Sequence, residues 1–414
     1  MANETPLGKR SAAEQMPAVV LGEMGLVRCL GEWGIPCIVI ACSEDHLAFA
    51  SRYCIKSVVV PSFNPDCQET RDQLLRIGRR LGRAILFCNG EPDFLFVSKN
   101  RHLLSPYFLI DLPTEKQADA LVDKGLFYRM AAEHRFPIPR TWQPQDAAEF
   151  ESILPELPFP CILKPMQQVY WKSPRFQARY GTGVKAIQVE KPEHLRFLYR
   201  EIVSFHPDLL IQEYIPGGDD HLYFFDAYLN ARSEPIGYFV AQRIRTYPIH
   251  CGISTLAQTV FHPEIARIGL HVLTSIGYQG AAHLDFKVDH RDRSVHLLEI
   301  NPRFGLAIDL GARAGINLPI RAYLSQLGRP PHFKAAYQTG MKWIDIKSDL
   351  KALQHYLKTE EWTLRSWLKS LRGPKMFRIW NARDPQPALV STRRFLQSQI
   401  RRVTQRFRRN ARPA

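Results

Sequence analysis

The segment 280–305 constrains the fold of this chain most, because two apolar runs flank a short polar turn, the pattern of an antiparallel hairpin. Apolar and polar residues alternate along the first run, so Asp285 projects from its less apolar face. Glu299 and Asn301 are two residues apart in the second run and share a face. If the hairpin is symmetric about Asp292, Asp285 lies directly opposite Glu299, and the three oxygen-bearing side chains converge on one point.

Three oxygen-bearing side chains on one face are the ligands that a hard dication uses when it bridges polyphosphate oxygens. The sequence therefore predicts a metal site at Asp285, Glu299 and Asn301, for Mg²⁺ or for Mn²⁺ in its place. The alternative interpretation is a solvated hairpin that carries its acids by chance.

The composition is that of a folded protein. The chain has 414 residues, of which 45% are hydrophobic and 23% are charged, enough for two or three domains. Its eight cysteines form no C-x-x-C pair and no Cys/His array, which argues against a zinc module and fits a reducing cytoplasm. Residues 1–16 lack the apolar core of a signal peptide, and no stretch reaches the roughly 20 apolar residues that span a bilayer. We therefore expect a cytoplasmic protein with a disordered N-terminus at 1–16.

The net charge of +15 is distributed unevenly. From Ser391 onward there are eight arginines and no acidic residue, so nucleic-acid binding by the folded body gains little support from the charge. Leu396, Ile400, Val403 and Phe407 recur there at the intervals of an amphipathic helix. Such a helix can lie on an anionic membrane surface, dock on the rest of the protein or bind another polyanion, and we favour the membrane surface.

Strands and helices alternate in the first part of the chain. Apolar runs predict four strands, at 17–22, 35–42, 57–62 and 84–90. Helical spacing of apolar residues predicts two helices, at 24–34 and 71–82. This order implies a parallel, Rossmann-like sheet. Gly22 and Gly25 do not form the G-x-G-x-x-G pattern of a dinucleotide site, so we interpret them as packing glycines.

Two basic or glycine-rich features follow a predicted helix at 114–134. Lys164 ends an apolar strand, and a lysine there fits a polyphosphate partner, because burial without a partner is costly. The alternative is an edge lysine that reaches solvent. Gly181, Thr182 and Gly183 lie in a short hairpin, where exposed N–H groups can cradle phosphate oxygens or where the glycines form a plain β-turn.

A second predicted strand ends in a glycine-rich bend. Gln212, Glu213, Tyr214 and Ile215 precede Pro-Gly-Gly and can present backbone donors and acceptors to a planar base. Asp220 follows in the bend and can accept hydrogen bonds from ribose hydroxyls. The alternative is an ordinary strand–loop–strand connection.

Basic side chains precede and follow the predicted metal ligands. Arg303 lies two residues after Asn301, where a guanidinium can stabilise charge that develops on a transferred phosphoryl group. Arg243, Arg245 and His250 lie on an earlier segment and are candidates for holding an acidic substrate. The alternative for these three is a basic surface strand.

The order of these motifs resembles the ATP-grasp superfamily. The likeness covers about residues 17–325 and includes Lys124 in a DK-x-x-x-Y helix, Lys164 in ILKP, YGTGV, QEYIPGGDD and LEINPRFG, the last being the most specific. Within the superfamily the chain is similar to carboxylate–amine ligases of the D-aspartate ligase type. The resemblance implies a fold of the α/β and α+β classes, with a Rossmann-like N-terminal domain followed by a two-lobed ATP-grasp fold.

The resemblance also implies roles for individual residues. Lys124 and Lys164 would bind the phosphates of ATP, and Glu213 and Ile215 would meet adenine. Asp220 would meet ribose. The predicted metal ligands Asp285, Glu299 and Asn301 would hold magnesium. Two features depart from the family pattern: the first metal ligand is Asp where Glu is common, and the aromatic insert at 169–180 leaves the register of the glycine loop open.

The domain organisation follows from the same comparison. We expect a Rossmann-like domain at 17–112 and an ATP-grasp domain at 113–327, with its two lobes split near 215. Residues 328–414 would form a helical extension that ends in the basic amphipathic tail.

The implied activity is ATP-dependent ligation. A carboxylate would be activated as an acyl phosphate and an amine would displace phosphate to form an amide, with Arg303 and Lys164 as catalytic residues. Small-molecule acids and amines would be the partners. Two rival functions remain: a phosphotransferase that stops after phosphorylation, and a non-catalytic nucleotide-binding scaffold.

Overall fold

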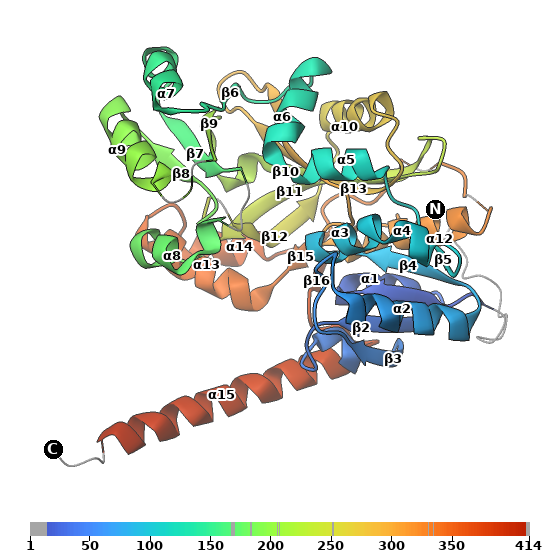
Figure 1. Ribbon diagram of the computed structural model, residues 1–414. Helices are drawn as coiled ribbons and strands as arrows, with labels where there is room; N and C mark the ends of the chain where they lie inside the picture. The colour runs from blue at the N-terminus through green and yellow to red at the C-terminus, as the bar shows by residue number, and fades with distance from the viewer. Residues whose placement is uncertain are drawn as a thin grey trace. The chain divides into compact units, whose positions relative to one another are not determined.

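The computed structural model describes residues 15–166, 170–182, 184–204, 206, 208–250, 252–329, 331–333 and 335–410; the side chains of 170 and 401–410 are not part of this description. The chain forms two compact units, one made of 1–110 and 376–414 and the other of 111–375 (Figure 1). The expected disorder at 1–16 falls almost entirely on residues 1–14, which lie outside the described residues.

The first unit contains a five-stranded sheet in the order β3-β2-β1-β4-β5, and every pairing is parallel. This arrangement confirms the predicted Rossmann-like sheet. Its elements up to residue 110 are β1 (Ala18–Leu21), α1 (Met24–Gly31), β2 (Cys37–Ala41), the 3₁₀ helix η2 (Leu47–Ala50), β3 (Cys54–Val59), α2 (Gln68–Leu81), β4 (Ala84–Cys88), α3 (Glu91–Lys99), α4 (Arg101–Leu104) and β5 (Phe108–Leu109).

Burial explains why the sequence shows continuous apolar runs here rather than alternation. Every residue of β1, β2 and β4 is buried, as expected for central strands covered by helices on both faces. Strand β3 lies at the edge of the sheet and is largely exposed.

The segment after residue 375 returns to the first unit through a buried ion pair. Arg28 Nε lies 2.9 Å from Asp384 Oδ2, and both side chains are almost completely buried. The same guanidinium donates to the backbone oxygens of Arg378 and Ile379, at 3.0 and 2.8 Å. Asp384 also accepts from Ser51 Oγ at 2.9 Å. These contacts hold in place a segment that no local sequence pattern pairs with residue 28.

The second unit holds two antiparallel sheets. The smaller has the order β6-β9-β7-β8, and its apolar side chains pack against those of α7, α8 and α9. The elements of this lobe are β6 (Thr141–Trp142), α7 (Ala147–Ile153), η3 (Leu154–Glu156), β7 (Cys161–Pro165), η4 (Tyr170–Lys172), α8 (Pro174–Tyr180), β8 (Ile187–Val189), α9 (Pro192–Val203) and β9 (Leu209–Glu213). The predicted glycine hairpin is therefore a longer connection that contains η4 and α8.

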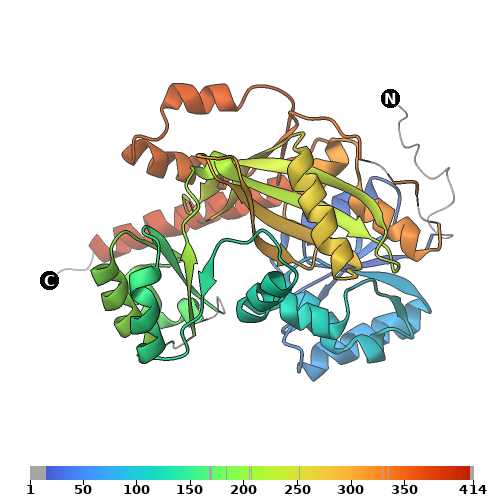
Figure 2. The ribbon, with the colours of Figure 1, turned by 90° about the horizontal axis from the view of Figure 1, so that it is seen from above.

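The larger sheet has the order β14-β13-β10-β11-β12-β15-β16. Apolar side chains from one face of its strands form a core with α5, α6 and α10, and Figure 2 shows α10 lying across the strands. The elements concerned are α5 (Glu115–Val122), α6 (Lys124–Glu133), η5 (Asp219–His221), β10 (Leu222–Leu229), β11 (Pro235–Tyr247), β12 (Ile253–Thr259), α10 (Pro263–Ser275), β13 (Gly280–Val288), β14 (Val295–Asn301), α11 (Ile308–Arg313) and α12 (Leu318–Gln326).

The expected single helix at 114–134 is two helices, α5 and α6. The chain leaves helical geometry at Asp123, whose φ and ψ are −82° and 117°. The Asp123 side chain accepts from Leu126 N at 2.9 Å and caps α6. Lys124 is therefore the first residue of a new helix rather than an interior one.

The segment 328–414 does not form a separate extension, because it is divided between the two units. Strand β15 (Lys342–Ile344) pairs with β12, and α13 (Ile346–Lys358) packs against β11 and β12. After α14 (Leu364–Ser370) and β16 (Lys375–Phe377), the long helix α15 (Gln386–Asn410) belongs to the first unit. In the part of the chain that the structure describes, no helix has the length and apolar character that crossing a membrane requires.

We predict that Asp384→Ala lowers the stability of the protein by about 3–5 kcal/mol, because it leaves the Arg28 guanidinium buried without its counter-ion. Urea unfolding followed by circular dichroism measures the change. The double variant Arg28→Met/Asp384→Leu removes both charges and should lose less stability than Asp384→Ala alone. Equal losses of stability in the two variants would contradict the explanation that an unpaired buried charge at Arg28 destabilises Asp384→Ala.

Candidate functional site

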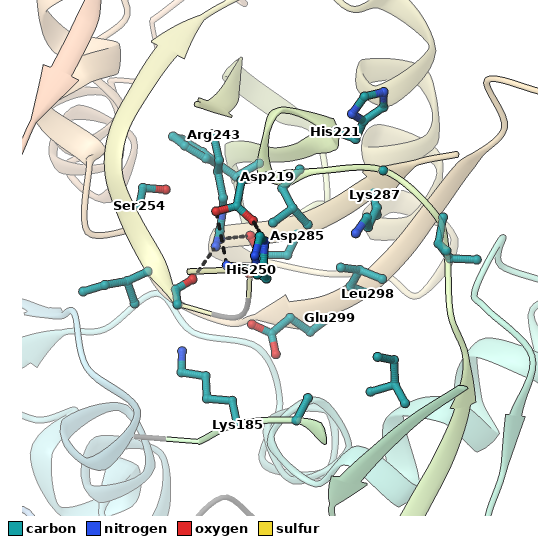
Figure 3. A pocket seen from close by; sticks show the side chains of 18 of the residues that line it. Lys185, Asp219, His221, Arg243, His250, Ser254, Asp285, Lys287, Leu298 and Glu299 are labelled. Atoms are coloured by element: carbon teal, nitrogen blue, oxygen red, sulfur yellow. Dashed lines mark hydrogen bonds and ion pairs between the residues drawn. The ribbon is translucent and has the colours of Figure 1, made fainter. Parts of the chain in front are cut away.

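A cavity of about 810 Å³ lies in the second unit, between the small lobe and the large sheet. Figure 3 shows several of its side chains, with Lys185 facing the acids of the large sheet across the cavity. Many of the residues predicted from the sequence line this cavity. They are Lys124, Lys164, Gln212, Glu213, Tyr214, Ile215, Arg243, His250, Asp285, Glu299, Asn301 and Arg303.

The predicted pairing of Asp285 with Glu299 is confirmed, but a β-bulge produces it. From Val288↔Val295 to Phe286↔Leu297 the hairpin keeps one register, and the register shifts by one residue before Asp285↔Glu299. Leu298 is the extra residue on β14. A hairpin symmetric about Asp292 would need no shift, so the predicted pair is correct but its predicted geometry is not.

The bulge decides which way the metal-ligand candidates point. Val295 and Leu297 are buried in the core, and simple alternation would direct Glu299 and Asn301 to the same side. Because one residue is inserted at Leu298, Ile300 takes the core position instead and is 2% exposed. Glu299 and Asn301 are thereby directed to the cavity.

The acids of this face belong to a network of alternating charges. Arg243 Nη2 donates to Asp285 Oδ1, and His283 Nε2 lies 3.4 Å from the same oxygen. His283 Nδ1 lies 3.0 Å from Asp226 Oδ1. Burial lowers the pKa of His283, but the charges of Asp226 and Asp285 outweigh it and raise that pKa to about 9. Burial raises the pKa of Asp285, but Arg243 and His283 hold the net value well below its usual range.

The donor set fits a hard dication that is also bound by phosphate. Among the described residues no group of three or more His, Cys, Asp or Glu side chains could hold a metal ion by itself. Asp285 and Glu299 supply two carboxylates, and the Asn301 amide lies beside them with Nδ2 donating to Glu299 Oε1 at 3.1 Å. One or two carboxylates completed by substrate phosphates and water is the usual environment of Mg²⁺.

Basic side chains outside the large sheet's charge network also border the cavity. Lys124 comes from the start of α6, Lys164 from β7 and Lys185 from the segment before β8. Lys164 Nζ donates to Gln212 Oε1 at 2.6 Å, and the Gln212 amide in turn donates to Thr141 Oγ1 at 2.9 Å. These bonds orient Lys164 at the end of its strand. Arg303 Nη2 donates to Asn301 Oδ1 at 3.3 Å.

The connection between the two lobes contributes apolar surface. Ile215 is 4% exposed and lines the cavity with Ile162 and Leu298. Lys287 Nζ lies 5.3 Å from the ring centroid of Tyr214. The Glu213 side chain forms a 3.0 Å ion pair with Arg140. Apolar walls contributed by both lobes can enclose a planar ring.

The cavity lining also includes His250, a residue in a left-handed conformation with φ of 68°. His250 N donates to Asp219 Oδ2 at 3.3 Å, and Nε2 lies 3.1 Å from Glu361 Oε1. Asp219 raises the pKa of His250, burial opposes this, and Glu361 raises the pKa further. A non-glycine residue with positive φ is costly and is often found at functional sites.

Arg245 is not brought to the cavity, and a second bulge explains the difference. The β11–β12 register shifts between Arg243 and Arg245, so these two residues point to opposite faces although they are two apart. Arg245 is 0% exposed and pairs with Asp349 through two bonds of 2.8 and 2.9 Å. Its guanidinium also lies 4.7 Å from the Trp362 ring centroid. The prediction of a substrate contact at Arg245 is replaced by a structural ion pair.

Three other predicted residues within the described chain are absent from the cavity lining. Gly181 and Thr182 are exposed and absent from its lining. Gly183 lies outside the described residues. Asp220 has an exposed side chain that lies 2.9 Å from the neighbouring His221 Nδ1. The ribose and phosphate roles expected for these residues remain predictions.

The cavity lining also includes four residues that were not predicted from the sequence: Lys185, Asp219, His283 and Glu361. Lys185 follows the glycine loop by two residues, and His283 lies two before Asp285 on the same strand face, so both carried a local signal. Glu361 comes from a segment far along the chain, and no local pattern connects it with His250.

Comparisons with known proteins find relatives in sequence and in fold. No family model matches the chain. The chain is 25% identical over 347 residues to D-aspartate ligase from Enterococcus faecium (strain Aus0004), covering 79% of this chain and 80% of that protein.

Solved structures with a similar fold have lower identity. N5-carboxyaminoimidazole synthetase from Staphylococcus aureus complexed with ADP matches with a TM-score of 0.61, 12% identity, and 84% and 87% of the two chains covered. L-amino acid ligase from Bacillus licheniformis matches with a TM-score of 0.56 and 14% identity, and the match covers 78% of this chain and 76% of that one. A third match is the biotin carboxylase domain of 2-oxoglutarate carboxylase from Hydrogenobacter thermophilus, in complex with MgADP, ADP and bicarbonate. Its TM-score is 0.59 and its identity 15%, and the match covers 78% of this chain and 72% of that one.

We predict that Glu299→Gln weakens Mn²⁺ binding at least about tenfold, measured by calorimetric titration in the presence of inorganic triphosphate, because it removes one of the two carboxylates at the site. Asp292→Asn changes an exposed acid in the turn of the same hairpin and should leave Mn²⁺ affinity unchanged. Unchanged affinity in Glu299→Gln would refute the metal-ligand role.

Proposed function

We propose that this chain, a member of the ATP-grasp superfamily, is an ATP-dependent ligase that joins a carboxylate to an amine. The fold of the solved ligase and carboxylase structures and the likeness to D-aspartate ligase support this class of reaction. The single observation that carries the proposal is the cavity in which Asp285 and Glu299 face Lys164 and Lys185. Acids and lysines opposed in this way match a magnesium-bound polyphosphate.

ATP would bind between the lobes. Gln212, Glu213, Tyr214 and Ile215 would meet the adenine ring through backbone groups and the apolar wall described above. Gly181, Thr182 and Gly183 would close over the phosphates, and Asp220 would meet ribose. Lys124, Lys164 and Lys185 would neutralise the triphosphate from the small lobe and from α6.

Asp285, Glu299 and Asn301 would hold magnesium, which when bound neutralises phosphate charge and polarises the phosphoryl oxygens. The neighbouring charges have a separate task. Because Arg243 and His283 keep Asp285 ionised, the acid remains an anionic ligand over the working pH range.

The chemistry proposed at this site has two transfers. A substrate carboxylate oxygen attacks the γ-phosphorus, the bond to the β-bridging oxygen breaks, and ADP leaves. The amine nitrogen then attacks the acyl carbon, loses a proton, and phosphate departs as the amide forms. Arg303, which lies beside Asn301, is placed to stabilise charge on the phosphoryl oxygens and on the tetrahedral intermediate.

Arg243 and His250 are the proposed ligands of the substrate carboxylate. Among the described residues, Arg243 Nε is buried without a hydrogen-bond partner, so the guanidinium keeps donor capacity after pairing with Asp285. His250 lies on the segment that follows β11, near the Gly252 oxygen that Arg243 Nη1 contacts at 3.4 Å. A guanidinium and a protonated imidazole together favour an anionic acid over a neutral amide.

Product analysis tests the function. The protein is incubated with MgATP and pooled small carboxylic acids and amines, with amino acids such as D-aspartate included because of the relative's activity. We expect ADP, phosphate and an amide to appear together in equal amounts, and only when both an acid and an amine are present. A stable phosphorylated acid without amide would instead favour a phosphotransferase, and nucleotide binding without turnover in any pool would favour a scaffold.

The His250 pair gives a pH prediction with a defined sign. Because Asp219 and Glu361 raise the pKa of His250, the imidazole carries a proton up to a higher pH than usual and loses it as pH rises through the raised value. KM for the carboxylate substrate should therefore increase with rising pH. In Glu361→Gln the increase should begin at lower pH, because one acid that raises the pKa is gone.

His250→Asn is the companion variant, since Asn tolerates the left-handed backbone of this position. It should raise KM for the acid at low pH and flatten its pH dependence, while KM for ATP stays unchanged. If KM for the acid depends on pH in His250→Asn as it does in the wild type, this side chain does not bind the substrate carboxylate.

A further inference from the structure

We propose that helix α15 (Gln386–Asn410) is a docking surface for an anionic lipid bilayer. The helix belongs to the unit made of 1–110 and 376–414, whereas the proposed active-site cavity lies in 111–375. Nothing in the reaction proposed above uses this helix. Its composition and its exposed apolar side chains therefore need a separate explanation.

An apolar stripe runs along the described part of α15. Leu389 and Leu396 are each 55% exposed, and Ile400 is 63% exposed. The three residues recur at intervals of seven and four, so they lie on one side of the helix. Val403 and Phe407 continue the same spacing along the helical backbone. An exposed stripe over several turns is uncommon on a helix that only covers its own protein.

The attachment of α15 to its unit leaves this stripe facing outward. The helix contacts η2 (Leu47–Ala50), and Arg394 Nη2 forms a 2.9 Å ion pair with Asp45 Oδ1. Arg394 precedes Leu396 by two residues, which is a rotation of roughly 160° about a helix axis. The docked side of α15 and the apolar stripe are therefore on nearly opposite sides.

The charge of the segment selects the partner. Residues 386–414 contain eight arginines and no acidic residue. A second copy of the helix would bring the same positive charge against the stripe without any acid to compensate, which disfavours self-association. A nucleic acid would satisfy the arginines but would leave the apolar stripe in water. An anionic bilayer satisfies both, because the stripe enters the acyl boundary while arginines reach the headgroups.

Co-sedimentation of the full chain with vesicles tests the proposal. Vesicles of phosphatidylcholine alone are compared with vesicles that contain about 30% phosphatidylserine, at low and moderate salt. We expect binding to the anionic vesicles only, and weaker binding as salt rises. A full chain that stays in the supernatant with anionic vesicles would overturn the proposal.

Two variants separate the apolar and electrostatic contributions. Leu396→Gln/Ile400→Gln removes the stripe, and Arg401→Gln/Arg402→Gln/Arg409→Gln removes three positive charges. Each should lower vesicle affinity at least about tenfold, because burial of aliphatic side chains and attraction of arginines both contribute to the bound state. Circular dichroism and the ligase assay verify that the rest of the protein is unchanged.

Matched controls come from the same unit. Ile55 is 63% exposed, the same fraction as Ile400, so Ile55→Gln should leave vesicle binding intact. Arg76→Gln/Arg80→Gln/Arg83→Gln removes three exposed arginines in and after α2 and should also bind like the wild type. Losses in these controls equal to those in the α15 variants would show that general charge and apolarity, not α15, drive binding.

Two further outcomes would replace the bilayer with another partner. If vesicle binding is absent and a DNA duplex binds in a manner that needs the α15 arginines but not the stripe, the surface takes nucleic acid. If vesicle binding is absent and sedimentation velocity shows a dimer that Leu396→Gln/Ile400→Gln converts to a monomer, the stripe is a contact between copies. Either result overturns the lipid assignment.

Discussion

The insertion of Leu298 into β14 is the constraint on which the site depends. A strand alternates its faces with a period of two, so a single extra residue transfers everything after it to the other side. Here Val295 and Leu297 enter the core, Ile300 resumes the core position, and Glu299 and Asn301 are directed to the cavity beside Asp285. Tyr128 OH donates to the Leu298 oxygen at 3.1 Å, which gives the bulged backbone a partner.

A second register shift, on β11, separates Arg243 and Arg245 onto opposite faces of the sheet. Arg243 stays on the cavity face and joins Asp285, whereas the irregular register after it turns Arg245 to the other face. There Asp349 accepts from Arg245, Thr255 and Trp367, and these bonds tie α13 and α14 to the sheet. Arg243 therefore faces the cavity, whereas Arg245 is buried in an ion pair that stabilises the packing of α13 on the sheet.

The cavity combines elements that are distant in the chain. Lysines of the small lobe, acids of the β13–β14 hairpin and Glu361 of the α13–α14 connection line one space. Opposed positive and negative walls suit a ligand that carries both phosphate groups and a cation. His250 lies between Asp219 and Glu361. Its charge therefore depends in part on Glu361, which lies in the segment 328–414 that was expected to be a separate extension.

The sequence by itself determined the parallel sheet of the first unit, the antiparallel hairpin and the identity of about half of the polar residues in the cavity. Those features follow from local periodicity, which one strand or helix expresses without its neighbours. Tertiary structure decided the bulge at Leu298, the burial of Arg245 and the pairing of Glu361 with His250 and of Asp384 with Arg28. Each of these depends on strand register or on contacts between segments far apart in sequence. The spacing of residues along one strand does not reveal that a residue such as Leu298 has no partner on the next strand.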